Sequence, residues 1–160
     1  MIKIGDAIPD VTVKHLGANG LEDVSTGELF AGGKVALFGL PGAYTPTCSA
    51  KHLPGFVAQY DALKAKGVDK IVCLSVNDAF VMKAWAESQA AEGKVETLAD
   101  GLAAFTKALG LEADLSVAGL GVRCRRFALI ADKGVVTWIA VEEAPGAFEV
   151  SSAEAVLAQL

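Results

Sequence analysis

Two short apolar runs on either side of a helical pattern constrain the fold of this chain more than any other feature. The runs are VALFGL at residues 35–40 and KIVCLSV at 70–76, and each is typical of a buried strand. Between them, Pro54 lies inside a predicted helix over 47–66 and is expected to kink it. The apolar residues at helical spacing are Leu53, Phe56, Val57, Tyr60 and Leu63.

The rest of the chain continues the alternation of strands and helices. The expected elements are a strand at 11–16 with a turn near 18–20, a helix at 79–91 capped by Asp78, a strand at 94–100, a helix at 101–110 ended by Gly110, a hairpin at 125–143 turning at 132–134, and a helix starting at Ser151 or Ser152. This order predicts one domain over residues 1–160. The predicted fold is an α/β sandwich with a mixed central sheet and helices on both faces, compatible with a thioredoxin-like fold.

The composition excludes several classes of protein. With 52% hydrophobic and 21% charged residues, the chain is globular and not disordered. Its net charge of −5 argues against nucleic acid as the main partner. No apolar run is long enough for a membrane span, and the N-terminal MIKIGDAIPD has no apolar signal-peptide core. We therefore expect a cytoplasmic protein whose three cysteines are mostly free thiols.

The stretch PGAYTPTCS at 41–49 places Cys48 in the first turn of the predicted helix, shortly after a strand. Unpaired backbone N–H groups and the helix dipole both stabilise a thiolate there. Thr45 or Thr47 can cap the helix, while Pro41 can pin the loop and shield the sulfur. Cys48 is therefore a candidate nucleophile, with a buried packing residue as the simpler alternative.

Two other interpretations of Cys48 involve His52, four residues further along the same helical face. A metal site is disfavoured because the sequence has no C-x-x-C pair. A Cys–His pair is also typical of acyl-transfer enzymes such as hydrolases, but the only other histidine is His15 and no further member of such a site is identifiable. A third alternative is a redox-sensing or chaperone-like protein that uses Cys48 only as a switch.

Four stretches of the chain resemble the peroxiredoxin family. Pro41, Thr45 and Cys48 match its P-x-x-x-T-x-x-C signature. The longer runs PGAYTPTCSAKHLPGF, CLSVNDAFVMKAW and GLGVRCRRFALI are similar to the type II (atypical, fifth-type) subfamily, as is KIGDAIPD near the start. The resemblance covers nearly the whole chain.

This resemblance implies a thioredoxin-like fold and an antioxidant activity, the thiol-dependent reduction of hydrogen peroxide and organic hydroperoxides through a sulfenic acid on Cys48. It implies that Thr45 hydrogen-bonds the peroxide and the sulfur, that Pro41 closes the pocket, and that Arg126, the arginine before Phe127, is the active-site arginine. Neither a metal nor an organic cofactor is implied.

The resemblance also implies a homodimer with its contact near the active-site loops. Tyr44 and Phe80 fall on a predicted loop and a predicted helix start, where a monomer would expose them.

The run RCRR at 123–126 has a simpler alternative, a solvated charged surface. Strand alternation places Cys124 and Arg126 on one face and Arg123 and Arg125 on the other. Cys124 departs from the family pattern, which often has serine there. It is either a small packing residue or a thiol with a redox role on the same side as Arg126.

The sequence leaves open how a sulfenic acid on Cys48 returns to the thiol. The C-terminal region contains no cysteine, so a resolving cysteine there is absent. Cys73 lies 25 residues beyond Cys48, a resolving position in some type II members, but its strand context predicts burial. The other route is an external thiol, either glutathione with glutaredoxin or thioredoxin. We favour glutathione with glutaredoxin because it needs only an accessible Cys48.

Overall fold

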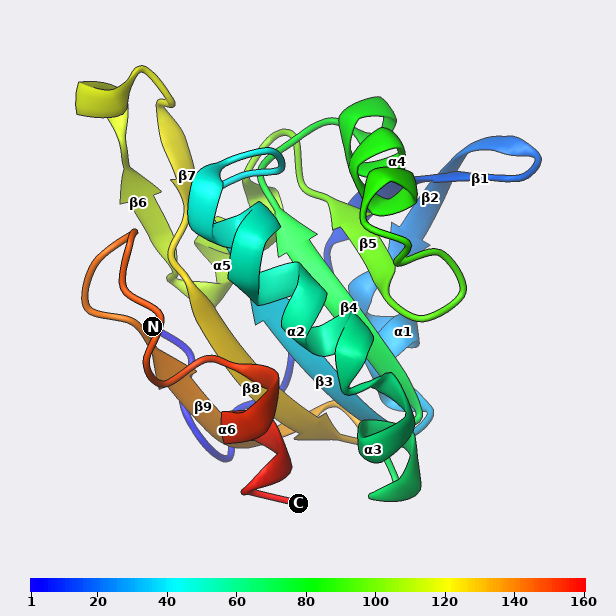
Figure 1. Cartoon of the computed structure of the whole chain (residues 1–160). Coiled ribbons are helices and arrows are strands. Elements are labelled where there is room, and N and C mark those ends of the chain that lie inside the picture. The colour runs from blue at the N-terminus through cyan, green and yellow to red at the C-terminus, as the bar shows by residue number, and fades with distance from the viewer.

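The computed structural model describes residues 1–160 and contains a seven-stranded sheet in the order β2-β1-β5-β4-β3-β8-β9 (Figure 1). Strands β3, β4 and β5 are parallel, whereas β1 and β8 run antiparallel to their neighbours β5 and β3, so the predicted mixed sheet is confirmed. The seven strands are β1 Thr12–Gly17, β2 Gly20–Ser25, β3 Lys34–Gly39, β4 Lys70–Ser75, β5 Glu96–Ala99, β8 Phe127–Asp132 and β9 Val135–Val141.

A small second sheet pairs β6 Glu112–Asp114 with β7 Val122–Cys124. The helical elements are α1 Thr26–Ala31, the π-helical turn η1 Cys48–His52, α2 Leu53–Ala58, α3 Tyr60–Ala65, α4 Ala79–Ser88, α5 Ala104–Leu109, the 3-10 turn η2 Ser116–Ala118 and α6 Ala153–Leu157. None of these helices has both the length and the apolar character that crossing a bilayer requires.

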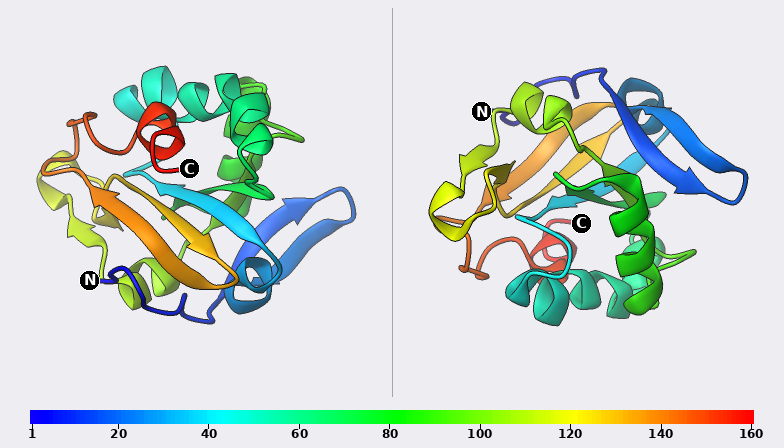
Figure 2. Two further views of the ribbon diagram at one scale, coloured as in Figure 1. Left: turned by 90° about the horizontal axis from the view of Figure 1, so that it is seen from below. Right: turned by 90° about the horizontal axis from the view of Figure 1, so that it is seen from above.

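Helices cover both faces of the large sheet, as predicted. In Figure 2 the sheet lies between a layer that contains α2, α4 and α6 and a layer that contains α1 and α5. The first layer forms a core with Phe56 and Trp85, which also includes Cys48 and Cys73. The second layer forms a separate core with Phe30 of α1 and residues of α5. The sheet therefore separates two apolar cores.

Strands β3 and β4 are buried on both faces, which explains their continuous apolar sequence. In β3, Ala36 and Phe38 belong to the core of the first layer, whereas Val35 and Leu37 belong to the core of the second. Strand β3 lies between β4 and β8 in the sheet. A strand in that position has no solvent-facing side, so it needs no alternation of apolar and polar residues.

The predicted helix over 47–66 forms, but it is not continuous. The π-helical turn over Cys48–His52 comes first, where the Leu53 N–H donates to the Cys48 carbonyl instead of to the residue four positions back. Pro54, which has no N–H, follows directly, and a second interruption lies at Gln59 between α2 and α3. The irregularity expected at Pro54 thus takes the form of a π-turn beside it, a feature frequent at functional sites.

Several local signals in the sequence are confirmed. The Asp78 carboxylate accepts from Val81 N–H and starts α4, and the Ser152 hydroxyl accepts from Ala155 N–H and starts α6. Gly110 ends α5 in the left-handed conformation, with φ at 71°. Helix α4 is shorter than predicted and ends at Ser88.

Candidate active site

The candidate nucleophile Cys48 lies where the loop after β3 enters the helical segment, and its side chain is fully buried. The first backbone hydrogen bond of that segment runs from Ser49 N–H to Thr45 C=O at 3.0 Å. The amides of Thr47 and Cys48 precede this bond, so they belong to the first turn, where N–H groups have no intrahelical acceptor. The prediction that Cys48 lies in the first turn of a helical segment, shortly after a strand, is therefore confirmed.

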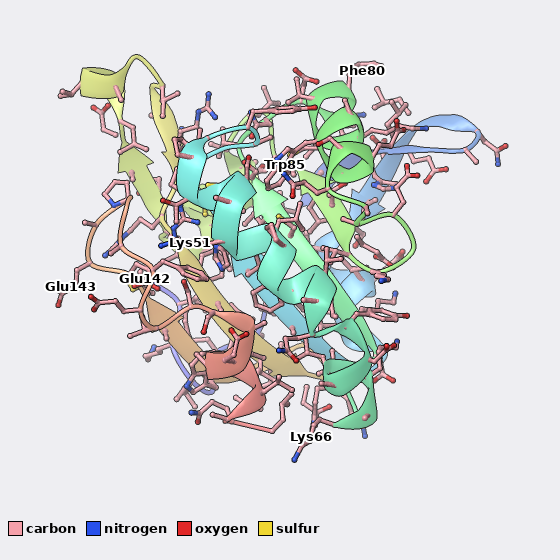
Figure 3. All side chains as sticks on the ribbon, in the orientation of Figure 1. Lys51, Lys66, Phe80, Trp85, Glu142 and Glu143 are labelled. Carbon is pink, nitrogen blue, oxygen red and sulfur yellow. The ribbon has the colours of Figure 1, made fainter.

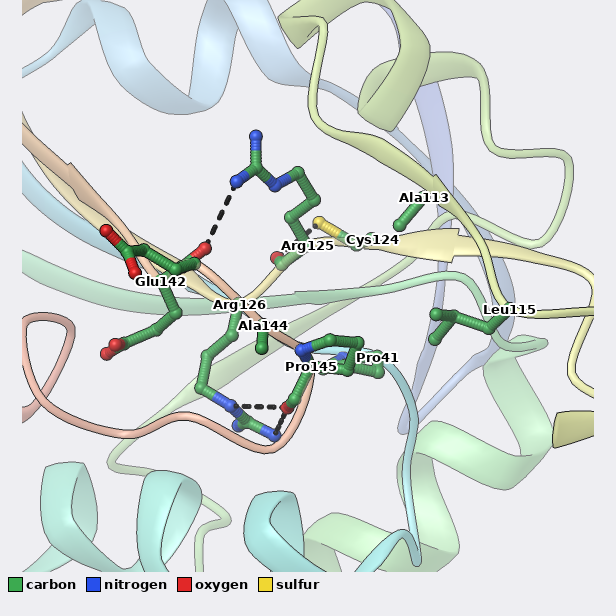
Figure 4. A pocket seen from close by; sticks show the side chains of 10 residues that line it. Pro41, Ala113, Leu115, Cys124, Arg125, Arg126, Glu142, Ala144 and Pro145 are labelled. Atoms are coloured by element: carbon green, nitrogen blue, oxygen red, sulfur yellow. Dashed lines mark hydrogen bonds between the residues drawn. The ribbon is translucent and has the colours of Figure 1, made fainter. Parts of the chain in front are cut away.

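Arg126, at the start of β8, is the cation that reaches this sulfur. Its Nη2 group donates to Cys48 Sγ at 3.2 Å, and its Nη1 group contacts His52 Nδ1 at 2.9 Å. The carbonyl of Pro145 accepts from Nε at 3.4 Å and from Nη2 at 3.2 Å, as Figure 4 shows. The four contacts involve all three guanidinium nitrogens and fix the direction in which the planar fork of N–H donors points.

The buried charge of Arg126 has no carboxylate partner. The salt bridges of the protein are Lys3–Asp6 and Lys14–Asp23, both on the surface. Arg126 is only 2% exposed, and a cation in such a place is costly unless an anion or hydrogen bonds compensate it. Of the groups that it contacts, only the Cys48 sulfur can become an anion. The geometry is therefore complementary to a thiolate at Cys48.

His52 is a neutral member of the same cluster. Because a guanidinium only donates, Nδ1 accepts from Arg126, and the proton is on Nε2, which donates to the Ser151 carbonyl at 2.9 Å. Burial, and secondly the charge of Arg126, lower the pKa of His52 to about 3. Neither ring nitrogen is available to take a proton from Cys48, so the hydrolase alternative has no support in this geometry.

Thr45 and Pro41 lie on the loop that precedes Cys48. The Thr45 hydroxyl donates to the Gly42 carbonyl at 2.7 Å and makes no hydrogen bond with Cys48, unlike the expectation from the sequence. Its oxygen retains acceptor capacity. Pro41 is buried, and its carbonyl accepts from Arg123 Nη1 at 3.2 Å.

Arg123 and Arg125 have contacts that the sequence does not reveal. Arg123 also donates from Nε to the Leu120 carbonyl, and a Cβ at Gly42 would lie 2.6 Å from its Nη1. The guanidinium can approach the loop this closely because residue 42 is glycine. Arg125 donates from Nη2 to the Glu142 carbonyl at 3.1 Å. The run is therefore not merely a solvated charged surface, because each arginine holds a different backbone segment.

The expectation that Cys124 lies on the same side as Arg126 is wrong. Both are buried, but Cys124 belongs to the core of the second layer, whereas Arg126 contacts Cys48 in the first. Residues 125 and 126 separate β7 from β8, and strand alternation does not continue through this break. Burial raises the pKa of the Cys124 thiol, so it is protonated and a poor nucleophile.

Cys73 lies in the middle of the large sheet. It is paired with Phe38 on β3 and Thr97 on β5, and its side chain is fully buried. Burial, and secondly the neighbouring Cys48, raise the pKa of the Cys73 thiol. Cys48, Cys73 and Cys124 are all free thiols. The prediction that Cys73 is buried is confirmed.

A cavity of about 290 Å³ lies beside Arg126, as Figure 4 shows. It is lined by Pro41, Ala113, Leu115, Cys124, Arg125, Arg126, Glu142, Glu143, Ala144 and Pro145. The segment after β9 has no motif that marks it as part of the site, although it supplies two carbonyls to the cluster around Cys48. Backbone carbonyls have no sequence signature, so only the folded chain reveals them.

Comparisons with known proteins agree with this fold. The Redoxin family model matches residues 3–157. Peroxiredoxin-2C of Oryza sativa subsp. japonica is 54% identical over 99% of this chain and 98% of its own length. Peroxiredoxin-2B of Arabidopsis thaliana is 51% identical over the same shares of the two chains. The structure of reduced Prx3 from Vibrio vulnificus in complex with hydrogen peroxide has a TM-score of 0.94 at 55% identity, covering 99% of both chains.

The fold and these relatives define a thiol-dependent peroxidase, an oxidoreductase with a thioredoxin-like fold. The chain belongs to the peroxiredoxin family and is of type II. The predicted fold class and enzyme class are both confirmed. As a peroxiredoxin, it reduces a hydroperoxide at the expense of a thiol.

The neutral state of His52 predicts how stability depends on pH. In the folded protein His52 takes up a proton only near pH 3, whereas in the unfolded chain it does so near its ordinary value of 6.5. Between these values the unfolded state binds more protons, so stability rises with pH up to about 6.5 and no longer depends on His52 above it. Urea unfolding should show a loss of about 2 kcal/mol from this residue between about pH 7 and pH 5.

Substitution tests the origin of this loss. His52→Gln keeps one acceptor for Arg126 and one donor for Ser151 but does not titrate, so its stability should change much less over the same range. His15→Gln, at the only other histidine, should keep the wild-type dependence. If wild type and His52→Gln lose the same amount, His52 is not the group responsible.

Proposed function

We propose that Cys48 is the peroxidatic cysteine and that the protein reduces hydrogen peroxide and organic hydroperoxides. The observation that supports this most strongly is the contact of 3.2 Å from Arg126 Nη2 to Cys48 Sγ, made by a buried guanidinium without a carboxylate partner. The likeness to a Vibrio vulnificus relative whose structure is in complex with hydrogen peroxide supports the smaller substrate.

The proposed reaction is an in-line displacement at the peroxide. The Cys48 thiolate attacks one oxygen, the S–O bond forms as the O–O bond breaks, and the departing oxygen takes both electrons of that bond. A proton then converts the departing group to water or an alcohol, and Cys48 becomes a sulfenic acid. Because negative charge grows on the departing oxygen, positioned N–H donors lower the barrier more than they stabilise the bound peroxide.

Three groups supply these contacts in our proposal. Arg126 and the first-turn amides of Thr47 and Cys48 donate to the peroxide oxygens. The Thr45 hydroxyl, while it donates to the Gly42 carbonyl, accepts a hydrogen bond from the O–H of the hydroperoxide and so orients the substrate. Pro41 closes one side of the pocket, and its buried ring limits the access of water.

For the second half of the cycle we propose an external thiol, glutathione followed by glutaredoxin. The glutathione thiolate attacks the sulfenic sulfur of Cys48 and hydroxide leaves as water, so a mixed disulfide forms. Glutaredoxin then accepts the glutathionyl group and releases the Cys48 thiol. The raised pKa values of the Cys73 and Cys124 thiols support this route, because both are poor nucleophiles. Cys48 is as deeply buried as they are, so the turn around it must open before glutathione can reach its sulfur. Thioredoxin is the alternative reductant.

We also propose that residues 1–160 act as one domain in a reducing compartment such as the cytoplasm. The Redoxin match over residues 3–157 and the three free thiols support this. Mild proteolysis should leave one stable fragment of nearly full length, and two separately stable fragments would contradict it.

Substitutions at the contact pair test the main proposal. Cys48→Ser should abolish peroxide consumption, because the other two thiols are buried, protonated and without an arginine donor. Arg126→Lys keeps the charge but loses the fork, and should lower kcat/KM for hydrogen peroxide by about a hundredfold. Arg125→Lys is the matched control and should lose far less, because Arg125 contacts a backbone carbonyl. Equal losses at both arginines, or activity in Cys48→Ser, would contradict the assignment.

The reductant test concerns Cys73. If its burial makes it a packing residue, Cys73→Ser should keep glutathione-dependent turnover, and oxidised wild type should have a glutathione adduct on Cys48 by mass spectrometry. Cys124→Ser is the matched control. A quantitative Cys48–Cys73 disulfide in the presence of glutathione would instead identify Cys73 as the resolving cysteine and require local unfolding of the π-turn.

We propose that the protein is a homodimer. Tyr44, on the loop after β3, is 57% exposed and Phe80, at the start of α4, is 63% exposed; Figure 3 labels Phe80 at the outer end of that helix. Leu102, on the loop after β5, is more exposed still. These apolar side chains follow the three parallel strands, whose ends lie at one edge of the sheet. Sedimentation should give twice the chain mass of 16.5 kDa, and a monomer only would refute the dimer.

A further inference from the structure

The segment from Glu142 to Ser151, here called the 142–151 loop, joins β9 to α6 and supplies two acceptors to the cluster around Cys48. The Pro145 carbonyl accepts twice from Arg126, and the Ser151 carbonyl accepts from His52. The position of the guanidinium therefore depends on where this loop holds its carbonyls. A loop with no helix or strand of its own needs some other contact to hold it in place.

The carboxylate of Glu142 supplies that contact. It accepts from Glu149 N–H at 3.0 Å, from Val150 N–H and Ser151 N–H at 2.9 Å each, and from the Ser151 hydroxyl at 2.6 Å. The first residue of the loop thereby binds its last three residues, and the side chain is buried. Burial alone would raise the pKa of Glu142, but these hydrogen bonds outweigh it and hold the pKa below its usual range.

The backbone of Glu142 is tied to the arginine run as well. Its N–H donates to the Arg126 carbonyl at 2.9 Å, and its C=O accepts from Arg125 Nη2 at 3.1 Å. Glu142 is thus bonded to the chain at Arg126 on one side and to Ser151 on the other. Figure 4 shows the contacts from Arg125 to Glu142 and from Arg126 to Pro145. Because Pro145 holds the guanidinium and Ser151 holds its histidine neighbour, Glu142 completes a ring of contacts around Arg126.

We propose that Glu142 is a positioning residue for the peroxidase reaction: its carboxylate closes the 142–151 loop, so that the Pro145 and Ser151 carbonyls aim the Arg126 fork at Cys48. This inference rests on the proposed function, in which Arg126 donates to the reacting atoms. Glu142 makes no hydrogen bond with Cys48, so its effect on the reaction passes through Arg126. A glutamate is required because four donors converge on it, and the amide of glutamine would point an NH₂ group at some of them.

The direct test is Glu142→Gln, with Glu143→Gln as the matched control. Glu143 is the next residue, is exposed and loses the same charge, but it makes no hydrogen bond; both are labelled in Figure 3. The second-order rate of Cys48 oxidation by hydrogen peroxide should fall by about tenfold or more in Glu142→Gln, because a misplaced donor is costly. Glu143→Gln should react at the wild-type rate. An unchanged rate in Glu142→Gln overturns the proposal.

A double-mutant cycle separates positioning from general destabilisation. If Glu142 acts through Arg126, Glu142→Gln should change the oxidation rate by less than about twofold once Arg126 is already lysine. Full additivity of the two losses overturns the proposal. Ser151→Ala removes one of the hydrogen bonds and keeps the others, so a smaller loss in the same direction is expected. If Glu142→Gln does not fold, the Ser151→Ala variant decides, and an unchanged rate there overturns the proposal.

A measurement without peroxide keeps this inference distinct from the proposed function. The fraction of Cys48 present as thiolate at neutral pH, taken from its ultraviolet absorbance in wild type minus Cys48→Ser, should fall in Glu142→Gln and not in Glu143→Gln. Retained peroxidase activity in Cys48→Ser would disprove the proposed function alone. An unchanged thiolate fraction in Glu142→Gln would disprove the role of Glu142 alone.

Discussion

A guanidinium buried without a carboxylate determines the arrangement of this peroxiredoxin site. Arg126 is almost fully buried, yet its contacts are a sulfur, a neutral imidazole and a backbone carbonyl. Carbonyl dipoles and His52 make the burial of the cation tolerable, but they do not neutralise it. In the function that we propose, the anion that balances this charge is the sulfur of Cys48, the only contacting group that can carry a negative charge.

The fold provides this interaction by bringing distant segments together across one face of the sheet. Cys48 follows β3, Arg126 directly precedes β8, and the two strands are neighbours in the sheet, so the two residues meet although 78 positions separate them. The π-turn places His52 against the guanidinium from the same segment as Cys48. The 142–151 loop places the Pro145 carbonyl on the guanidinium and the Ser151 carbonyl on His52. Each segment contributes a polar group to the edge of an otherwise apolar core, where the low dielectric strengthens every contact.

The three cysteines differ in the groups that surround their sulfur atoms. All are fully buried, and all are free thiols. Burial raises the pKa of the Cys73 and Cys124 thiols, because it disfavours the charged form. Cys48 alone has a guanidinium donor at its sulfur. The number of cysteines therefore does not show which one differs from the others. The contact between a sulfur and a guanidinium identifies Cys48.

Local signals in the sequence by themselves determined the main elements: the apolar strands β3 and β4, the cap of Asp78, a start of α6 at Ser151 or Ser152, Gly110 at the end of α5, and Cys48 at a helix start. These depend on propensities and hydrogen bonds between near neighbours, so a short stretch is enough to predict them. Only the tertiary structure decided which sheet face Cys124 belongs to, because a break in strand pairing cancels the alternation rule. It also decided that the Pro145 and Ser151 carbonyls surround the arginine cluster and that Glu142 holds their loop. Such contacts join residues distant in the chain through backbone groups, which every residue has alike, so no residue type marks them in advance.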